Sequence, residues 1–369
     1  MQPFSLLIKP AGPDCNLACT HCFYAAKAQF FGGLTHKMSN DILDKMIHDY
    51  LLLRLPVSSF CWQGGEPTLM GLEFFKQAIE LQKKYGENDQ VVSNSLQTNA
   101  TLLDDNWCKF LREYRFLVGI SLDGPAQYHD YYRKSVAGQG SFERVMSAIA
   151  TLKKHQVEFN VLTLLTDHNV DSTDQIFSFL IEQGITYMQF IPCLEKQGDH
   201  IASYSITPDQ YGRFLCRLLD LWIAHGPQKV SIRLFDSVMS YLLNGNQTMC
   251  TFQKKCNDYV VVEHNGDVFA CDFFVEPQWL LGNLLETPID QLVNSQTKRM
   301  FSEKKNSVSN RCFVCRHFAI CRGGCLKERN FLNDDYKDNS YFCQSYQIFF
   351  DYALPKLMQV LPNTIRRTI

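Results

Sequence analysis

The chain alternates between short apolar runs that are typical of strands and longer segments in which apolar residues recur with the period of a helix. Predicted strands cover residues 5–9, 59–62, 91–96, 117–122, 157–165 and 185–191. Predicted helices cover residues 40–55, 71–85, 104–114, 141–155, 171–183 and 207–225. Alternating units of roughly thirty residues imply an α/β fold with a parallel sheet and helical crossovers, either closed into a barrel or open.

Segments rich in cysteine, glycine or polar residues, which are candidates for binding and catalysis, follow the carboxyl ends of these strands. They are the cysteine loop after the first strand, residues 64–67 after the second, residues 97–99 after the third, residues 121–123 at the end of the fourth, and Cys193 and Leu194 after the sixth. Ligands bind at this edge in both closed and open parallel sheets. The sequence therefore predicts a ligand site there.

The 15 cysteines fall into two groups and four isolated positions. Cys61, Cys108, Cys193 and Cys216 stand alone and are expected to be buried as small hydrophobic side chains. A secreted disulfide scaffold is usually shorter and has an even number of cysteines. Residues 1–10 lack the features of a signal peptide. We therefore expect a cytoplasmic protein whose grouped thiols bind metal or carry out chemistry.

The composition excludes several classes of protein. The 369-residue chain has a formal net charge of −2, with 46% hydrophobic and 20% charged residues, which is typical of globular proteins and not of disordered ones. A near-neutral charge gives no electrostatic reason to expect nucleic acid as a partner. No apolar run approaches the roughly 18 residues of a transmembrane helix, so no membrane association is expected.

The first cysteine group is Cys15, Cys19 and Cys22, directly after the first predicted strand. This spacing also suits one face of a helix, but Gly12 and Pro13 just before it disfavour a helix there. Three thiolates can bind three irons of a 4Fe-4S cluster. The fourth iron then keeps an open position for a substrate or cofactor, as a catalytic zinc ion does.

The second group contains eight cysteines, which are Cys250, Cys256, Cys271, Cys312, Cys315, Cys321, Cys325 and Cys343. Eight thiolates are enough for two metal sites with four thiolate ligands each and no open coordination position. Closely spaced cysteine pairs also bind zinc, and ligand type alone does not separate zinc sites from iron–sulfur clusters. Both kinds of site remain open on the spacing alone.

Two motifs resemble those of radical S-adenosylmethionine enzymes. Residues 15–24, Cys-Asn-Leu-Ala-Cys-Thr-His-Cys-Phe-Tyr, resemble the cluster loop of that family, and residues 64–67, Gly-Gly-Glu-Pro, resemble its glycine-rich strand end. The resemblance implies that residues 1–235 form a partial (β/α)6 TIM-like barrel. This barrel would bind a 4Fe-4S cluster and S-adenosylmethionine, the source of a 5′-deoxyadenosyl radical.

The second cysteine group resembles the SPASM extension of the same enzymes, which carries two auxiliary 4Fe-4S clusters. The resemblance therefore implies three clusters in all and a C-terminal SPASM domain over residues 236–369. By the family pattern, Cys250, Cys256, Cys271 and Cys325 would bind the first auxiliary cluster. The second would be bound by Cys312, Cys315, Cys321 and Cys343.

Within this superfamily the chain is most similar to anaerobic sulfatase-maturating enzymes, over essentially its whole length. Matching segments are residues 6–10, 22–24, 63–68, 95–99, 116–125, 157–160, 188–190 and 271–273. The resemblance implies oxidation of a cysteine or serine in a sulfatase, within a Cys/Ser-x-Pro-x-Arg-like motif, to Cα-formylglycine. It also implies anaerobic conditions and flavodoxin or ferredoxin as the electron donor.

The resemblance also assigns roles to single residues. Asp272 aligns with the catalytic base and directly follows a predicted cluster ligand, so one backbone step holds a carboxylate beside an electron acceptor. Cofactor contacts carry over to His21, Gly65, Ser121, Arg133 and Leu194, and peptide contacts to Tyr24, Gln63 and Arg233. The alternatives are a solvated or hydrogen-bonding carboxylate for Asp272, a solvated charge for Arg133, and packing or surface roles for the peptide-contact residues.

Two rival functions remain. One is a different radical modification of peptides, such as thioether cross-linking or quinone-cofactor maturation, although the adjacent Cys271 and Asp272 favour dehydrogenation. The other is a non-enzymatic structural protein that binds zinc. Metal content separates the second rival from radical chemistry, because three clusters give roughly twelve irons per chain.

Overall fold

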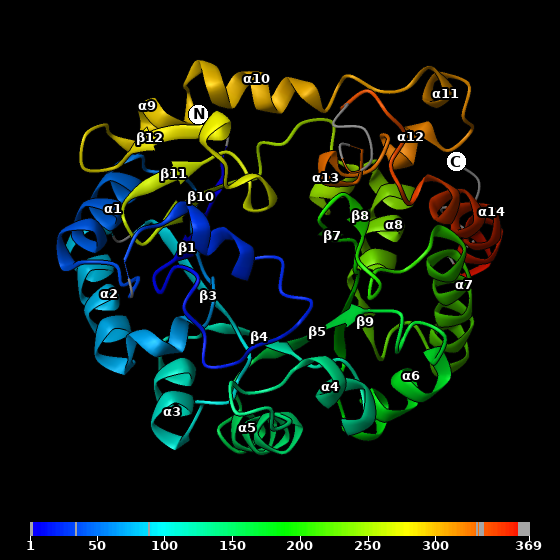
Figure 1. Cartoon of the computed structure of the whole chain (residues 1–369), viewed down its shortest axis with the longest axis horizontal. Helices are drawn as coiled ribbons and strands as arrows, with labels where there is room; N and C mark the ends of the chain where they lie inside the picture. The colour runs from blue at the N-terminus through cyan, green and yellow to red at the C-terminus, as the bar shows by residue number, and fades with distance from the viewer. Residues whose placement is uncertain (1–2, 34, 88, 330, 332–335, 361–369) are drawn as a thin grey trace. The chain divides into compact units, whose positions relative to one another are not determined.

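The computed structural model describes residues 3–33, 35–87, 89–329, 331 and 336–360. The chain divides into two compact units, whose segments can be followed by colour in Figure 1. Unit one contains Met1–Ser121, Tyr132–Phe159 and Cys256–Ser302, and unit two contains Leu122–Tyr131, Asn160–Lys255 and Glu303–Ile369. Each unit therefore combines segments that are far apart in the sequence.

Unit one is built on a mainly parallel sheet with helices beside it (Figure 1). Its first four strands are β1 (Ser5–Lys9), β2 (Val57–Trp62), β3 (Val91–Thr98) and β4 (Leu117–Ser121), parallel and adjacent in that order. Its helices include α1 (Asn40–Leu52), α2 (Leu72–Tyr85), α3 (Asp105–Glu113), α5 (Phe142–Lys154), η1 (Ala25–Phe30) and η2 (Pro67–Met70). Ser39 caps α1 by accepting a hydrogen bond from the Ile42 amide. The buried face of α1 consists of Ile42, Leu43, Met46, Ile47 and Tyr50, the spacing of an amphipathic helix.

Three more strands come from the cysteine-rich part of the chain and extend this sheet beyond β1. They are β10 (Tyr259–Glu263), β11 (Asp267–Phe269) and β12 (Leu280–Asn283), with η4 (Asp272–Phe274) and η5 (Pro277–Trp279) before β12 and α9 (Ile289–Val293) and α10 (Gln296–Lys304) after it. β10 runs parallel to β1 and places Glu263 opposite Lys9. β11 pairs antiparallel to both β10 and β12. The turn after β10 contains Gly266 at φ +87°, a conformation that glycine adopts without strain.

Unit two contains a small parallel sheet of β5 (Phe159–Leu165), β6 (Tyr187–Pro192) and β9 (Ser231–Ile232). Its other elements include β7 (Lys196–Gln197), β8 (His200–Ile201), α4 (Ala126–Tyr132), α6 (Thr173–Glu182), α7 (Pro208–His225), α8 (Arg233–Asn244), η3 (Cys250–Phe252), α11 (Asn310–Phe313), α12 (Phe318–Cys321), α13 (Leu326–Arg329) and α14 (Cys343–Val360). Thr207 caps α7 in a capping box, and Pro208 is the first residue of that helix. α14 packs along α7, where the Ser345 hydroxyl donates to the Pro208 carbonyl at 2.5 Å.

The α/β class and the succession of strands and helices are confirmed, with element bounds shifted by a few residues. The sequence analysis missed β10, β11 and β12, which are short and lie between turns. It also missed α14, which contains Pro355. The boundary between residues 235 and 236 stays a prediction, because the two compact units follow spatial contacts and place residues 256–302 with the first strands.

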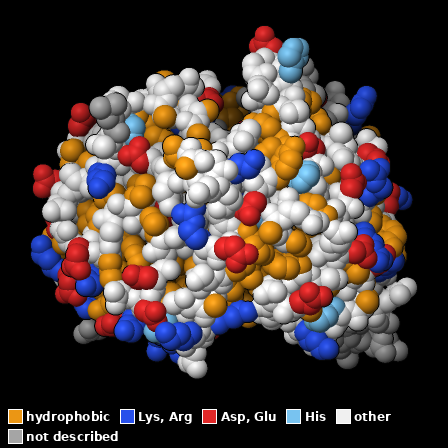
Figure 2. Space-filling model, turned by 60° about the horizontal axis from the view of Figure 1, so that its bottom comes forward, with side chains coloured by type: hydrophobic (Ala, Val, Ile, Leu, Met, Phe, Trp, Pro, Cys, Tyr) orange, Lys and Arg blue, Asp and Glu red, His pale blue; other side chains and the backbone are white. Residues whose placement is uncertain are grey.

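None of the described helices is long and apolar enough to cross a bilayer. On the face drawn in Figure 2, acidic and basic side chains are interspersed with hydrophobic ones. This mixture agrees with the formal net charge of −2.

Candidate active site

The loop that follows β1 is held against the end of β2 by backbone contacts. The Gly65 amide donates to the Gly12 carbonyl and the Glu66 amide donates to the Asp14 carbonyl, each at 2.8 Å. A Cβ atom at Gly65 would lie 2.0 Å from the Asp14 carbonyl oxygen, so only glycine fits this position. The glycine-rich strand end therefore supports the cysteine loop directly.

Three thiols are brought together in this loop. Cys15, Cys19 and Cys22 lie outside any helix, so the alternative of a helical face is wrong. The Leu17 amide lies 3.4 Å and Asn99 Nδ2 lies 3.6 Å from Cys15 Sγ. Burial raises the pKa of the Cys15 thiol to about 12, and the nearby thiols of Cys19 and Cys22 add to this rise. These thiols therefore lose their protons only when a cation such as a metal ion binds to the sulfur. The three sulfur donors fit three irons of a cluster.

A buried carboxylate joins the ends of β2 and β3 behind this loop. Glu66 is fully buried and accepts hydrogen bonds from the Thr68 amide at 3.0 Å, the Thr68 hydroxyl at 2.6 Å, the Thr98 hydroxyl at 2.7 Å and the Asn99 amide at 2.8 Å. Burial raises the pKa of Glu66 despite these bonds. Because Glu66 fixes the backbone at Asn99, it also orients the side chain that reaches Cys15.

Three of the four predicted cofactor-binding residues of unit one, His21, Gly65 and Arg133, lie in this loop or beside it. The Ala18 amide donates to the Lys134 carbonyl at 2.7 Å, so the segment that carries half-buried Arg133 runs beside the cysteines. The buried His21 ring lies 5.6 Å from the Tyr132 ring, edge to face. Ser121 ends β4 and accepts a hydrogen bond from Gln97 Nε2 at 3.3 Å. Cofactor contact by His21, Gly65, Ser121 and Arg133 stays a prediction.

Two of the predicted cofactor- and peptide-binding residues belong to unit two. Leu194 is buried just after β6, where the preceding Cys193 amide donates to the Leu165 carbonyl at 2.9 Å. Arg233 is the first residue of α8, is exposed, and donates to the Thr248 carbonyl at 3.3 Å. Their roles in binding the cofactor and the peptide also stay predictions.

The carboxylate of Asp272 has two partners from the first strands of unit one. Lys9 Nζ lies 2.6 Å from Asp272 Oδ1 as an ion pair, and Gln63 Nε2 donates to Asp272 Oδ2 at 3.2 Å. The side chain of Lys9 is 2% exposed and that of Asp272 is 14% exposed, so the carboxylate is not a solvated turn residue. Asp272 therefore lies in a fixed position directly after Cys271 and keeps a small accessible surface.

Tyr24 also contacts Lys9. Lys9 Nζ is 4.2 Å from the centre of the Tyr24 ring, a cation–π contact. The Tyr24 hydroxyl donates to the carboxylate of Glu263, with both oxygens at 2.6 Å. Burial, and then the negative charge of Glu263, raise the pKa of Tyr24 well above its ordinary value. Tyr24 is therefore a hydrogen-bond donor at neutral pH.

The structure thus brings three sequence-predicted residues, Tyr24, Gln63 and Asp272, into one cluster around Lys9. The sequence analysis missed Lys9 and Glu263, which are both buried. The sequence did contain a signal for both residues, which is a charged residue at the end of a mainly apolar strand. Lys9 is the last residue of β1, and Glu263 is the last residue of β10. Their proximity depends on the pairing of these two strands.

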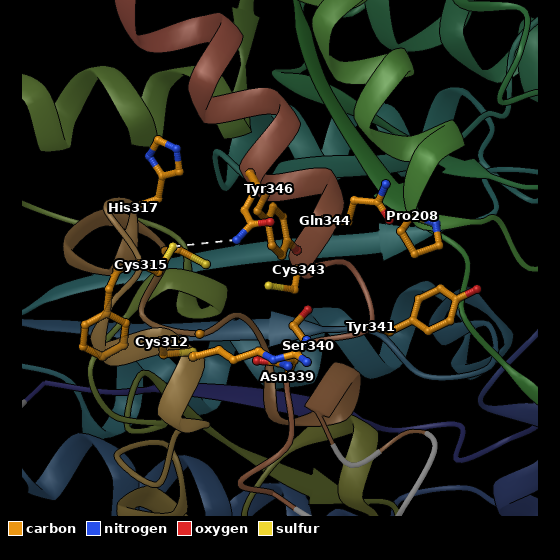
Figure 3. A pocket seen from close by; sticks show the side chains of 15 residues that line it. Pro208, Cys312, Cys315, His317, Asn339, Ser340, Tyr341, Cys343, Gln344 and Tyr346 are labelled. Atoms are coloured by element: carbon orange, nitrogen blue, oxygen red, sulfur yellow. Dashed lines mark hydrogen bonds between the residues drawn. The ribbon is translucent and has the colours of Figure 1, made fainter.

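The predicted second auxiliary site is a cavity in unit two (Figure 3). Its volume is about 310 Å³, and its lining includes Cys312, Cys315, Cys321 and Cys343. Gln347 Nε2 lies 3.9 Å from Cys315 Sγ. The His317 ring is turned away from the labelled cysteines in Figure 3 and contacts Asp351. Four thiols around a cavity fit a closed cubane.

The predicted ligands of the first auxiliary cluster are distributed over both units. Cys256 and Cys271 belong to unit one and Cys250 and Cys325 to unit two. The Tyr259 hydroxyl lies 3.2 Å from Cys271 Sγ, and burial raises the pKa of Cys271 to about 12. Among the described residues, no three histidine, cysteine, aspartate or glutamate side chains converge as ligands of one metal ion do. Each thiolate of a cubane binds a different iron.

Comparison with known proteins identifies the families of both parts of the chain. Residues 10–180 match the radical SAM superfamily, and residues 243–316 match an iron–sulfur cluster-binding domain. The chain is 38% identical to a cysteine-type anaerobic sulfatase-maturating enzyme of Clostridium perfringens, over 98% of this chain and 100% of that protein. It is 36% identical to a serine-type enzyme of Bacteroides thetaiotaomicron, over 96% of this chain and 90% of that protein.

A solved structure is also similar to this chain over nearly its whole length. Native anSMEcpe with bound AdoMet and Cp18Cys peptide has a TM-score of 0.91 and 38% sequence identity, over 97% of this chain and 99% of that chain. The sequence similarity and the fold similarity both extend over nearly the whole length. This chain therefore belongs to the anaerobic sulfatase-maturating enzymes of the radical SAM superfamily.

Proposed function

We propose that this enzyme oxidises the Cβ of a cysteine or serine in a sulfatase polypeptide and produces Cα-formylglycine. The observation that carries the proposal is the carboxylate of Asp272, which is held by Lys9 and Gln63 beside a cluster ligand. A substrate side chain in front of this carboxylate would meet a positioned proton acceptor next to an electron acceptor. The peptide segment would carry a Cys/Ser-x-Pro-x-Arg-like motif.

The residues fit a 4Fe-4S cluster at Cys15, Cys19 and Cys22, and two auxiliary clusters at the eight C-terminal cysteines. When bound, the first cluster and S-adenosylmethionine supply a 5′-deoxyadenosyl radical that removes a hydrogen atom from Cβ. His21, Gly65, Ser121, Arg133 and Leu194 would hold S-adenosylmethionine. A guanidinium such as Arg133 matches the carboxylate of the methionine group.

The remaining steps need one proton acceptor and one electron acceptor. Asp272 accepts the proton of the substrate thiol or hydroxyl, because general base catalysis requires a carboxylate within hydrogen-bond reach of that proton. Lys9 keeps the carboxylate in place, and Gln63 fixes its second oxygen. The Tyr24 hydroxyl donates to the buried carboxylate of Glu263, and Tyr24, Gln63 and Arg233 would contact the peptide. Loss of one hydrogen atom, one proton and one electron leaves an aldehyde or thioaldehyde.

The cellular setting follows from the chemistry. Radicals and clusters react with oxygen, so the enzyme would act under anaerobic conditions, and the proposed location is the cytoplasm. A small flavodoxin or ferredoxin would deliver the electron that starts each reaction. Neither nucleic acid nor a membrane is a partner in this scheme.

The test is mass spectrometry of two peptides that differ only in cysteine or serine at the target position. Reconstituted enzyme, reductant and S-adenosylmethionine should remove two hydrogens from the serine peptide. The cysteine product should also exchange its sulfur for oxygen after hydrolysis. Trapping with a hydrazide separates an aldehyde from a thioether, which also lacks two hydrogens. Absence of a trapped product from both peptides would refute the proposal and favour another radical modification.

A further inference from the structure

Asn99, Asn16 and Thr101 form a closed ring of side-chain hydrogen bonds next to the cysteine loop. Asn99 Nδ2 donates to Asn16 Oδ1 at 2.9 Å, Asn16 Nδ2 donates to the Thr101 hydroxyl at 2.9 Å, and that hydroxyl donates to Asn99 Oδ1 at 2.7 Å. All three residues belong to unit one, and Asn99 is 8% exposed. Each side chain of the ring therefore donates to one neighbour and accepts from the other.

The backbone fixes the orientation of the Asn99 side-chain amide. The backbone amide of Thr101 lies 3.0 Å from Asn99 Oδ1, and a backbone N–H can only donate. This contact decides which atom of the side-chain amide is the oxygen, a choice that shape alone does not make. The buried carboxylate of Glu66 accepts from the Asn99 backbone amide at 2.8 Å and holds the residue in place. Asn99 Nδ2 must therefore face away from Thr101.

The nitrogen of this side chain is directed at a predicted cluster ligand. Asn99 Nδ2 carries two hydrogens, of which one is donated to Asn16 and the other to Cys15 Sγ at 3.6 Å. The Leu17 amide donates to the same sulfur at 3.4 Å. The Cys15 thiol also lies 4.0 Å from Asn16 Oδ1, and iron would replace the thiol proton of this contact. The two N–H donors to the sulfur would remain.

An N–H donor beside a ligand sulfur affects the redox chemistry of the cluster. Hydrogen bonds to the sulfurs are among the factors that set the reduction potential of an iron–sulfur cluster. Reduction adds negative charge to the cluster, and a hydrogen bond to a more negative acceptor is stronger. The donor therefore stabilises the reduced form more than the oxidised form. Loss of the Asn99 donor should lower the potential of the cluster that reduces S-adenosylmethionine.

We propose that Asn99 is a positioning residue for the first cluster, whose side chain is locked by Asn16 and Thr101, donates to Cys15 Sγ and raises the reduction potential of the cluster. This inference rests on the proposed function through the assignment of Cys15 as a cluster ligand. None of the three ring side chains ionises near neutral pH, so the donor is present whatever the protonation state of nearby groups.

The test is an anaerobic redox titration of the full-length protein, followed by electron paramagnetic resonance. A full-length variant with Cys15, Cys19 and Cys22 replaced by alanine keeps only the auxiliary clusters, and subtraction of its spectrum isolates the signal of the first cluster. Asn99→Leu has a similar shape but no N–H donor in its side chain. At a fixed potential, the ratio of reduced to oxidised first cluster should fall at least threefold, which is about 28 mV at 59 mV per tenfold for one electron. The auxiliary signals should not move.

Matched variants separate the hydrogen bond from a structural disturbance. Thr101→Val removes the hydroxyl that closes the ring and should lower the potential less than Asn99→Leu does, because the Thr101 backbone amide still holds Asn99 Oδ1. Thr101→Ser keeps the hydroxyl and should retain the wild-type potential. Asn106→Leu removes an exposed asparagine side chain from α3 of the same unit and should also leave the potential unchanged.

An unchanged first-cluster potential in Asn99→Leu overturns the inference, and so does an equal shift in Asn106→Leu. If Asn99→Leu binds no first cluster, the two Thr101 variants decide. A lower potential in Thr101→Val than in Thr101→Ser then supports the inference, and equal potentials overturn it. Failure of the proposed function is distinguishable, because it appears in the peptide assay and leaves these potentials as expected. Absence of any signal that depends on the first cysteine group would refute both.

Discussion

Asp272→Asn tests the central claim that a buried ion pair positions the base. The substitution preserves the shape of the side chain but removes its charge and its ability to accept a proton. Radical formation should continue, because the first cluster loop does not include this residue. Formylglycine yield per 5′-deoxyadenosine should fall by about 10²-fold or more, the range that a positioned general base supplies.

The same substitution should destabilise the protein, because it leaves Lys9 as an unpaired buried cation. Breaking a buried pair costs about 3–5 kcal/mol, and we expect about 3 kcal/mol because the asparagine oxygen can still accept from Lys9. The low exposure of both side chains, 2% and 14%, means that water does not screen this loss. The double variant Lys9→Met with Asp272→Asn should regain most of the stability, since neither residue of the pair then carries a charge.

Anaerobic urea unfolding of the wild type, both single variants and the double variant gives the coupling free energy between the two residues. Quantification of 5′-deoxyadenosine and of hydrazide-trapped aldehyde in the same samples gives the yield ratio. The double variant should be stable but inactive in aldehyde formation. Full aldehyde yield from Asp272→Asn, or additive stability effects, would refute the reasoning.

Three further predictions concern the cluster loop, the auxiliary cavity and the buried Glu66. Gly65→Ala places a Cβ 2.0 Å from the Asp14 carbonyl oxygen and should cost the protein its first cluster, roughly four irons per chain, whereas Gly32→Ala, with nothing within 4 Å, should keep all of them. Cys343→Ala should remove roughly four irons from the cavity of unit two but leave S-adenosylmethionine binding intact; full iron content would exclude Cys343 as a ligand. Because burial raises the pKa of Glu66, its contribution to stability is full below the unfolded pKa of about 4.3 and is lost as pH rises through the folded pKa. The free energy of unfolding of the wild type in urea should therefore exceed that of Glu66→Gln by a smaller amount as pH rises. A difference that grows with pH would contradict a raised pKa of Glu66.

Much of the first cluster site was predictable because its parts are local in sequence. Cys15, Cys19 and Cys22 lie in one short loop, and the helix-breaking residues before them exclude a regular helix. The carboxyl ends of parallel strands share one edge, so residues 64–67 and 97–99 were expected near this loop. The contacts of Gly65 with the loop and of Asn99 with Cys15 confirm that expectation.

The partners of the base were not predictable in the same way. Tyr24 and Glu263 are 239 positions apart and meet because β10 pairs with β1 in a parallel register. The sequence predicts Lys9 only as the last residue of a strand. Its neighbours in the sequence do not predict that a carboxylate from the cysteine-rich region lies beside it.

Ligand spacing and strand–helix alternation depend on neighbouring residues, so the sequence was enough to predict the thiols that are expected to bind iron and the family that the chain resembles. The tertiary structure alone decided which charges are buried and what each one faces. Burial and pairing result from contacts between distant strands and helices, and these contacts set the position of Asp272.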